Sequence, residues 1–294
     1  MSEPVPHDPL APDAIGERGA ARARVRPKRR VPWLALASAL VLLMVVGWGL
    51  MPRLFTSADP LLGQPLQALQ APSGAHWFGT DQLGRDLFAR TIYGASTSLR
   101  ATGLAVLVAL LGGAPTGLLA GYFGGRFDAV VMRAVDVLMA IPSLLLAMAI
   151  VTVLGFGTIE IAVAVGLSAI ASFARLTRGE TLRWRGADFV DAAVVSGVGD
   201  LGVIVRHIVP HAAGPVLALA ALEFGSAVLS VSSLSFLGFG APPPQPEWGL
   251  LIAEGRNYLA LAWWYTTLPG LVVLLVVLSA NQLARFAQDS GAHR

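Results

Sequence analysis

Long stretches without Asp, Glu, Lys or Arg are the feature that most constrains this chain. Three clear runs of this kind cover residues 31–52, 101–125 and 137–159. About 20 apolar residues in a helix, at about 1.5 Å rise per residue, cross a hydrocarbon core of about 30 Å. Each run is therefore long enough to span a membrane, which argues against a water-soluble enzyme.

Three further spans are less clearly marked. Residues 161–174 form a shorter run bounded by Glu160 and Arg175, and it spans only if its helix extends past both charges. A fifth span is expected at about 212–232 and a sixth within 257–284. The sequence thus predicts an all-α polytopic membrane protein with about six transmembrane helices.

Composition supports this interpretation. The 294 residues are 55% hydrophobic and 13% charged, against about 25% charged in an ordinary soluble domain. The net charge of +3 lies in residues 1–30, which hold seven basic and four acidic side chains. The remainder is charge-balanced, so a basic face for nucleic acid is not expected. The absence of cysteine excludes disulfides, thiolate metal sites and cysteine nucleophiles.

The distribution of basic residues predicts the orientation, because Lys and Arg concentrate on the cytoplasmic side of membrane proteins. With the N-terminus inside, sixteen of the 21 basic residues fall in cytoplasmic segments, so both termini are expected there. The run 31–52 is too long for a cleaved signal peptide, and it ends in Trp48, Met51 and Pro52 where a cleavage site needs small residues. We interpret it as an uncleaved anchor.

These features divide the chain into five segments. A polar cytoplasmic loop, 175–211, interrupts the fourth of them, and 81–90 can form a helix capped by Thr80 or Asp81. The segments are a disordered basic cytoplasmic tail (1–30), a first transmembrane anchor (31–52), an outer segment with a short helix (53–96), a five-helix core (97–286) and a cytoplasmic C-terminal tail (287–294).

The cytoplasmic loop 175–211 is too polar for a span and too long for a simple turn. A short helix, a glycine break and a second helix fit its sequence. Ala192 and Ala193 are small enough to let another surface approach the backbone closely. Gly197 supplies the turn, and Asp200 can cap the helix that follows.

Four ordered motifs give the chain a resemblance to a known family. The first has an acid and two alanines at 191–193, then Gly197 and Pro210, with the family's spacing throughout. The others are 78–86 followed by Tyr93-Gly94-Ala95, 121–125 followed by Met132-Arg133, and 233–240 followed by Pro243 and Pro244. Together they resemble the inner-membrane permease subunits of ATP-binding-cassette (ABC) importers, in the dipeptide, oligopeptide and nickel branch. The resemblance runs from about residue 33 to the sixth span.

This resemblance implies a fold, a function and partners. The fold is that of a type I ABC importer permease, and the function is passage of peptides or similar small solutes across a bacterial inner membrane. The implied partners are a second homologous permease, two ATPase subunits, an extracytoplasmic solute-binding protein and the lipid bilayer. ATP and Mg²⁺ belong on the ATPase subunits, and no cofactor or enzymatic activity is expected here, since the sequence lacks a Gly-Lys-Ser or Gly-Lys-Thr phosphate loop. The implied ATPase-coupling residues are Asp191, Ala192, Ala193, Gly197, Asp200 and Pro210.

The chain departs from the family pattern at three places. Its motif acid is Asp191 where the family usually has the longer Glu, so the contact to the ATPase must be re-spaced. The acid that often precedes the Ser-Leu-Ser-Phe motif is missing, with Ser230 and Val231 in that neighbourhood. The family's Gly-Asp-Gly-Leu-Arg-Asp ending is replaced by another sequence at 284–289.

Four charged or polar residues are candidates for the pathway or for helix interfaces. Glu223 lies mid-span, where insertion scales assign a charged side chain a cost of about 2.5–3.5 kcal/mol. It either serves the pathway or a partner, or packs as a protonated or paired carboxyl. Arg133 and Asp136 flank the inner start of the third span and are expected to anchor an interface by pairing. Asn281 is expected to hydrogen-bond a neighbouring helix.

Tryptophans and prolines mark the outer boundary. Trp248, Trp263 and Trp264 are interpreted as anchors at the membrane interface. A role in an outer loop or gate is the alternative for part of this region. The candidates for it are Pro243, Pro244 and Trp248.

Two further patterns concern packing and metal binding. Gly112, Gly113 and Gly117 give the small-residue spacing of a close helix contact, for which the second permease is a candidate partner. His207 and His211 are four residues apart. Metal ligation by them is disfavoured because no carboxylate shares that spacing and Pro210, between them, is expected to interrupt the helix.

Other classes of function are weighed against an importer. An ATP-independent channel or secondary carrier normally has several ionisable residues along its path, whereas Glu223 is the one unambiguous example in this sequence. An intramembrane hydrolase needs a base beside its nucleophile, and the serines of 226–235 have no histidine within a span to activate them. The cargo is not identified by the sequence, since peptides, nickel chelates and glutathione are carried by near relatives with the same motifs.

Overall fold

The computed structural model of the protein describes residues 32–291; the predicted tail 1–30 and the last residues of the C-terminal tail lie outside this range. The described residues form helices and no strand. The longer helices are α1 (Pro32–Leu50), α2 (Leu87–Phe123), α3 (Gly125–Ala140), α4 (Ser143–Leu154), α5 (Thr158–Arg185), α8 (Val209–Phe236) and α10 (Trp263–Gly291). The shorter helices are α6 (Asp188–Val195), α7 (Asp200–Val203) and α9 (Trp248–Gly255).

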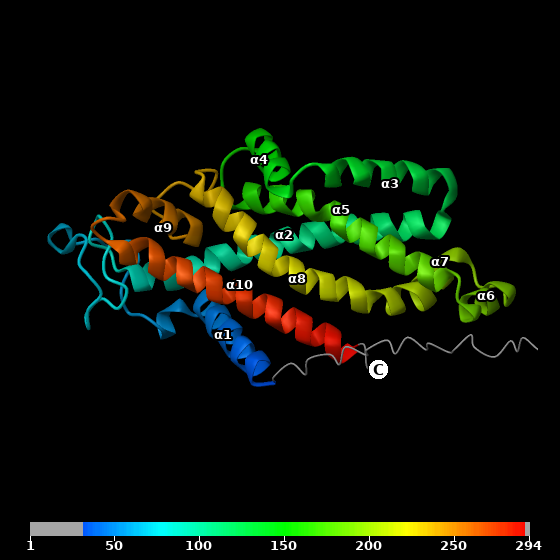
Figure 1. Ribbon diagram of the computed structural model, residues 1–294, viewed down its shortest axis with the longest axis horizontal. Helices are drawn as coiled ribbons and strands as arrows, with labels where there is room; N and C mark the ends of the chain where they lie inside the picture. Colours follow the sequence, from blue (N-terminus) through cyan, green and yellow to red (C-terminus); the bar gives the residue numbers. More distant parts are fainter. Residues whose placement is uncertain (1–31, 292–294) are drawn as a thin grey trace, which may run out of the picture. The chain divides into compact units, whose positions relative to one another are not determined.

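Five helical stretches are long and apolar enough to cross a membrane. They are α1, α2, α5, α10 and the continuous stretch Asp200–Phe236 that contains α7 and α8. Helices α3 and α4 meet at a bend of 97° and make a sixth crossing if they count as one broken span. Figure 1 shows α2, α5, α8 and α10 running lengthwise through the bundle, with α3 and α4 on one side of α5. The prediction of an all-α protein with about six spans is confirmed for the described residues.

The third and fourth predicted spans differ in their outcome. Helix α5 continues past both Glu160 and Arg175, so the short run 161–174 is part of a full span. The third run is broken, because Ile141 takes an extended conformation before Pro142. Proline disfavours a helical residue before it and lacks the N–H that a continuing helix needs.

The second span begins much earlier than its uncharged run suggests, and the predicted helix start is wrong. Residues 81–86 form a tight turn in which the Asp81 carboxylate accepts hydrogen bonds from the N–H groups of Leu83 and Arg85. Asp81 therefore does not cap a helix. Asp86 does, because its carboxylate accepts from the N–H of Ala89 at 2.7 Å, and α2 starts at Leu87.

Glycines allow α2 and α5 to form the most extensive helix contact in the structure. A Cβ atom added at Gly117 would lie 2.1 Å from the carbonyl oxygen of Ala174, and one added at Gly113 would lie 2.5 Å from that of Ile170. Such distances are far inside van der Waals contact. The small-residue spacing therefore serves a contact within the chain, and not with a second permease.

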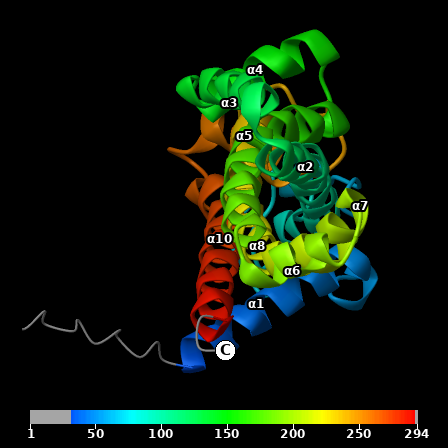
Figure 2. The same cartoon turned by 90° about the vertical axis from the view of Figure 1, so that its right-hand side faces the viewer.

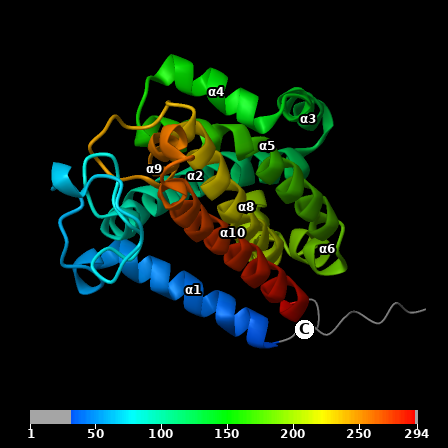
Figure 3. The same cartoon turned by 60° about the vertical axis from the view of Figure 1, so that its left-hand side comes forward.

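Helix α1 lies alongside α10 and α2 (Figure 3). Its inner face contributes Val45 and Trp48 to an apolar cluster that includes Ile92 of α2 and Val276 of α10. Its outer face exposes a row of leucines at 36, 40 and 43, each about 70% accessible. A helix with one packed face and one wide apolar exposed face fits a lipid-facing span.

Candidate functional site

The two short helices α6 and α7 lie together at one end of the long helices, which we call the α6 end (Figure 2). Val190 and Ala193 are the buried residues of α6, and Val203 is that of α7. Val190 and Val203 pack against Tyr122, near the end of α2, and against Ile208, just before α8. This apolar layer fixes both short helices on the ends of α2 and α8.

The residues predicted to contact an ATPase divide between this layer and the exposed surface. Asp191 and Ala192 are exposed, whereas Ala193 is buried. Gly197 follows the end of α6 with φ +84°, and its N–H donates to the carbonyl of Val194. This conformation is one that residues with a Cβ adopt rarely, so glycine is needed for the turn.

Two local predictions are wrong: Asp200 does not cap α7, and Pro210 does not interrupt the helix. Gly199 occupies the cap position of α7, while the Asp200 carboxylate accepts a hydrogen bond of 2.7 Å from the Tyr122 hydroxyl. That bond ties the start of α7 to the end of α2. Pro210 is the second residue of α8 and follows a π-helical turn, so the chain stays helical through it. Proline is tolerated in this first turn.

Large apolar side chains are exposed at the α6 end. Val195 is 88% accessible and Leu201 is 75% accessible, and Val194 and Val205 are also more than half exposed. Exposed apolar groups gathered in one place mark an interaction surface. The α6 end therefore has a rigid buried side and an apolar outward side.

His207 and His211 lie together at this end as part of an aromatic group. The His211 ring is 4.7 Å from that of Trp184 and 5.0 Å from that of Phe189, between centroids. Phe189 is also stacked on His207. Among the described residues there is no group of three or more His, Asp or Glu side chains placed to hold a metal ion. The two rings pack α6 against the start of α8.

The opposite end of the long helices, which we call the α9 end, contains a buried cluster of charges. The Arg85 and Asp81 side chains pair directly, and Arg90 Nη2 donates to Glu254 Oε2 at 3.1 Å. Arg90 Nε also lies 3.6 Å from Asp81 Oδ2, and its side chain is 0% exposed. The Tyr265 hydroxyl donates to Glu254 at 3.1 Å. The cluster joins the segment between α1 and α2 to α2, α9 and α10.

This cluster explains the motif at 78–86 but was not predicted from it. The spacing of Asp81 and Arg85 gave a signal for local pairing, since i and i+4 residues meet in a helix or tight turn. Glu254 and Tyr265 come from distant parts of the chain. Their participation depends on how α9 and α10 return to the start of α2.

Glu247 is a second buried carboxylate at this end, and sequence reasoning missed it. It lies at the cap position of α9 and accepts from the N–H groups of Gly249 and Leu250 and from the Ser98 hydroxyl at 3.0 Å. Burial raises the pKa of the Glu247 carboxyl above its usual range, and the hydrogen bonds act in the opposite direction. An acid directly before an apolar helix was the available sequence signal.

The tryptophans at this end correct the prediction of interfacial anchors. Trp248 is fully buried and its Nε1 donates to the carbonyl of Thr91 at 3.0 Å. Trp264 is also buried, and only Trp263 among the three is exposed as an anchor requires. Trp248 thus fixes α9 on α2. A bulky side chain buried this way has no free surface for a gate.

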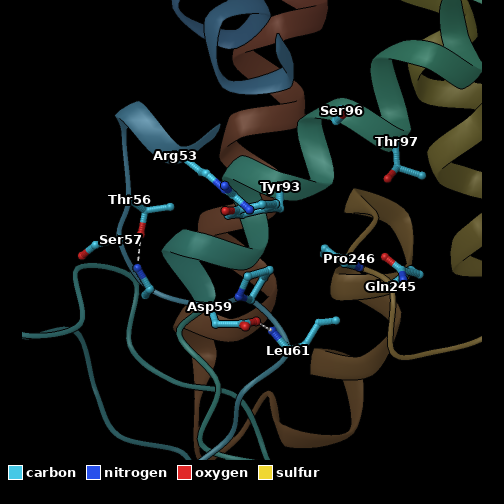
Figure 4. A pocket seen from close by; sticks show the side chains of 12 residues that line it. Arg53, Thr56, Ser57, Asp59, Leu61, Tyr93, Ser96, Thr97, Gln245 and Pro246 are labelled. Carbon is cyan, nitrogen blue, oxygen red and sulfur yellow. Dashed lines mark hydrogen bonds between the residues drawn. The ribbon is translucent and has the colours of Figure 1, made fainter. Parts of the chain in front are cut away.

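A cavity of about 640 Å³ lies between the segment after α1, the first part of α2 and the loop before α9. Figure 4 shows Arg53 reaching toward Tyr93, with Asp59 farther along the wall and Gln245 across from Tyr93. The gate candidates Pro243 and Pro244 are exposed beside it but do not line it. The cavity has both a cationic and an anionic side chain at its rim.

Residues 113–289 match the family of binding-protein-dependent transport system inner membrane components. The dipeptide transport system permease of Alkalihalophilus pseudofirmus is 37% identical over 257 residues, which cover 87% of this chain and 84% of that protein. The glutathione transport system permease of Pectobacterium atrosepticum is 40% identical over 221 residues, 75% of this chain and 73% of that protein. This chain belongs to the family.

A solved structure supports the fold of the permease. The crystal structure of an amino acid ABC transporter with histidines aligns with a TM-score of 0.50 and 17% identity, over 68% of this chain and 92% of that chain. The permease is a multi-pass inner membrane protein and a transport subunit of an ABC importer, not an enzyme. Such an importer works with ATPase and binding-protein partners.

Three of the pathway or interface candidates lie at helix contacts or on the surface of the permease. Asp136 pairs with Arg175 of α5 at 2.5 Å, and not with Arg133, which is exposed. Asn281 packs on Gly225, where an added Cβ would lie 2.8 Å from its Oδ1. No hydrogen bond of the Asn281 side chain is found among the described residues. The predicted hydrogen bond is thus replaced by a packing contact between α10 and α8.

Glu223 is placed differently from the other three. It lies near the middle of α8 and lines a cavity of about 60 Å³ together with residues of α2, α4 and α5. Within residues 32–291 its carboxylate has no hydrogen-bond or ion-pair partner. The permease therefore carries an unpaired carboxylate beside a cavity at the level of the membrane.

Proposed function

We propose that the permease imports di- or tripeptides, or small solutes of similar chemistry, as one half of an ATP-driven pathway. The relatives named above are permeases for dipeptides and for glutathione, and glutathione is itself a tripeptide. The cavity at the α9 end supports this class of cargo, because Arg53 and Asp59 are complementary to the two charged ends of a short peptide.

The observation that carries the proposal is the geometry of the α6 end. Helices α6 and α7 are fixed by their buried sides on α2 and α8, while Asp191, Val195 and Leu201 face outward. A rigid projection of this kind transfers a push from a partner into two long helices, as a rigid-body transition requires. The proposed partner at this surface is an ATPase subunit, which binds the ATP and Mg²⁺.

The proposed assembly contains a second homologous permease, two ATPase subunits and an extracytoplasmic solute-binding protein. The α6 end faces the cytoplasm, and both termini lie there, because this orientation puts most Lys and Arg residues inside. The α9 end then faces outward, where its cavity is open to a solute delivered by the binding protein.

The test compares two glycines of one loop in cells that express the complete transporter. Gly197→Val places a β-branched residue where φ is +84°, whereas Gly199 has φ −70° and open space around a Cβ, so Gly199→Ala is the matched control. We expect Gly197→Val to insert normally and to abolish uptake of radiolabelled dialanine, and Gly199→Ala to keep it. Wild-type uptake by Gly197→Val would refute the coupling role of this loop.

Purification of the complex in mild detergent tests the partners independently. We expect one further permease and two ATPase chains to be retained with this chain. Recovery of the chain alone as a stable homo-oligomer, together with solute flux through it in liposomes, would instead indicate an ATP-independent channel or carrier.

A further inference from the structure

The cavity beside Glu223 concentrates polar groups in an apolar part of the helix bundle. On α8, Glu223, Ser226 and Ser230 are spaced three and seven residues apart, so they share one helix face. Ser168 of α5 and Ser143, the first residue of α4, complete the polar lining. One carboxylate and four hydroxyls from three helices therefore surround about 60 Å³ of space.

The depth of this cavity in the helix bundle makes its polar lining costly in free energy. Ionisable residues at such a depth mark functional sites. Glu223 lies near the middle of α8, and Ala105 on the opposite wall lies near the middle of α2. Carboxylates at this depth normally pair with a cation. No Lys, Arg or His pairs with Glu223 among residues 32–291, so its carboxylate oxygens are free to accept from a cation that those residues do not supply.

The chemistry of the lining selects the kind of cation. Every polar group here has oxygen acceptors, and an ammonium group presents three N–H donors that a carboxylate and hydroxyls can accept together. A divalent metal is a poor match, since the described residues contain no cluster of three or more His, Asp or Glu side chains. The volume admits a group about the size of –NH₃⁺ but not a whole peptide.

We propose that this cavity is a transit site for a primary ammonium group of the cargo, with Glu223 as its counter-ion and the serines as additional acceptors. The rest of the solute stays outside the cavity, toward Ser143 and Ser226, which are exposed and mark its open side. The inference rests on the proposed function, because it requires a cargo that carries a free amine, as a peptide does.

Carbodiimide labelling of the purified complex tests the site directly. Dicyclohexylcarbodiimide modifies carboxyl groups in apolar surroundings, and mass spectrometry gives the rate at Glu223 and at a control carboxyl. Glu160 is that control, because it lies in the first turn of α5 and does not line the cavity. Labelling is followed with no addition, with dialanine, with N-acetyl-dialanine and with sodium chloride.

We expect dialanine to slow labelling of Glu223 about fivefold at about four times its dissociation constant, since an occupied site is protected in proportion to its occupancy. N-acetyl-dialanine lacks the ammonium group and should not protect, and Glu160 should be labelled equally in all conditions. Equal protection by both peptides, no protection by dialanine, or protection by sodium chloride alone would overturn the inference.

Uptake assays separate this inference from the proposed function. In cells with the complete transporter and saturating dialanine, we expect Glu223→Gln to slow uptake while Glu160→Gln does not. If the wild-type transporter takes up dialanine but dialanine does not protect Glu223 from labelling, the transit site is overturned and the proposed function is not. Absence of dialanine uptake by the wild-type transporter would refute the proposed peptide cargo, and the labelling experiment would still decide whether the cavity binds an ammonium group.

Discussion

The contact between α2 and α5 predicts the effect of a single substitution, in which a methyl group replaces one hydrogen atom of a glycine in α2. Replacing Gly117 with Ala puts a Cβ 2.1 Å from the carbonyl oxygen of Ala174, 2.8 Å from its carbonyl carbon and 2.9 Å from the amide nitrogen of Arg178. All three atoms belong to the α5 backbone, so no side chain can rotate away. The helices must separate locally by about 1 Å to restore normal contact.

The free-energy cost of this substitution is estimated from overpacking in other protein interiors. Forcing one extra carbon into a packed contact costs about 1–3 kcal/mol. The small gain in helix propensity from Gly to Ala, about 1 kcal/mol, opposes it. Because the opposing atoms are backbone and cannot rotate away, the upper part of the overpacking range applies, which leaves a net loss of about 1–2 kcal/mol. This loss corresponds to a melting temperature lower by about 2–8 °C for a protein of this size.

Gly103 provides the matched control, because it lies in the same helix with no atom within 4 Å of an added Cβ. We expect Gly103→Ala to melt at the wild-type temperature or slightly above it, and Gly117→Ala to melt several degrees below, measured by tryptophan fluorescence in detergent. Equal melting temperatures for the two variants would refute the assigned helix contact.

The remaining predictions concern the buried polar groups at the two ends. Arg90→Ala leaves Glu254 and Asp81 short of a buried partner and should destabilise the protein by about 3 kcal/mol, with faster proteolysis between α1 and α2; unchanged cleavage would contradict the role of the cluster. Tyr122→Phe removes the hydrogen bond to Asp200 and should cost about 1 kcal/mol, seen as faster hydrogen exchange in α6 and α7; exchange at the wild-type rate would show that the bond does not hold α7. Burial raises the pKa of Glu247 above its ordinary value of 4.5, so the folded state favours the protonated acid, and stability should fall as pH rises from that value through the folded pKa. Glu247→Gln should flatten this dependence in melting curves recorded as the pH rises above 4.5, and an identical slope in both proteins would argue against it.

Much of the fold could be predicted because the membrane imposes length and polarity on each span. The charge-poor runs located the five spans and the bent pair α3–α4, and the helix–glycine–helix pattern of 188–203 was found in place. The ends of the helices were harder to predict, because a helix can continue through charged residues that form ion pairs elsewhere in the fold. Arg175 is inside α5 and pairs with Asp136, and Arg90 is inside α2 and pairs with Glu254.

The candidate site residues also divide into those that the local sequence predicts and those whose position depends on packing. Gly197 was predicted from its spacing and is required by its backbone angle, which is a local property. The second alanine of the same motif, Ala193, is buried and not exposed, because tertiary packing decided which side of α6 faces α2. Trp248 was assigned to an interface from its type alone, and the return of α9 onto α2 placed it in the interior.

The sequence by itself determined the membrane setting, the approximate positions of the spans and the family, because these depend on local hydrophobicity and on motifs of adjacent residues. Tertiary structure alone decided which charges became partners, which glycines were contact points and where Glu223 points. Those properties arise from residues far apart in the chain: Arg90 meets Glu254, Tyr122 meets Asp200, and the wall opposite Glu223 is built by α2 and α5. No short-range pattern contains such pairings, since the packing of whole helices creates them.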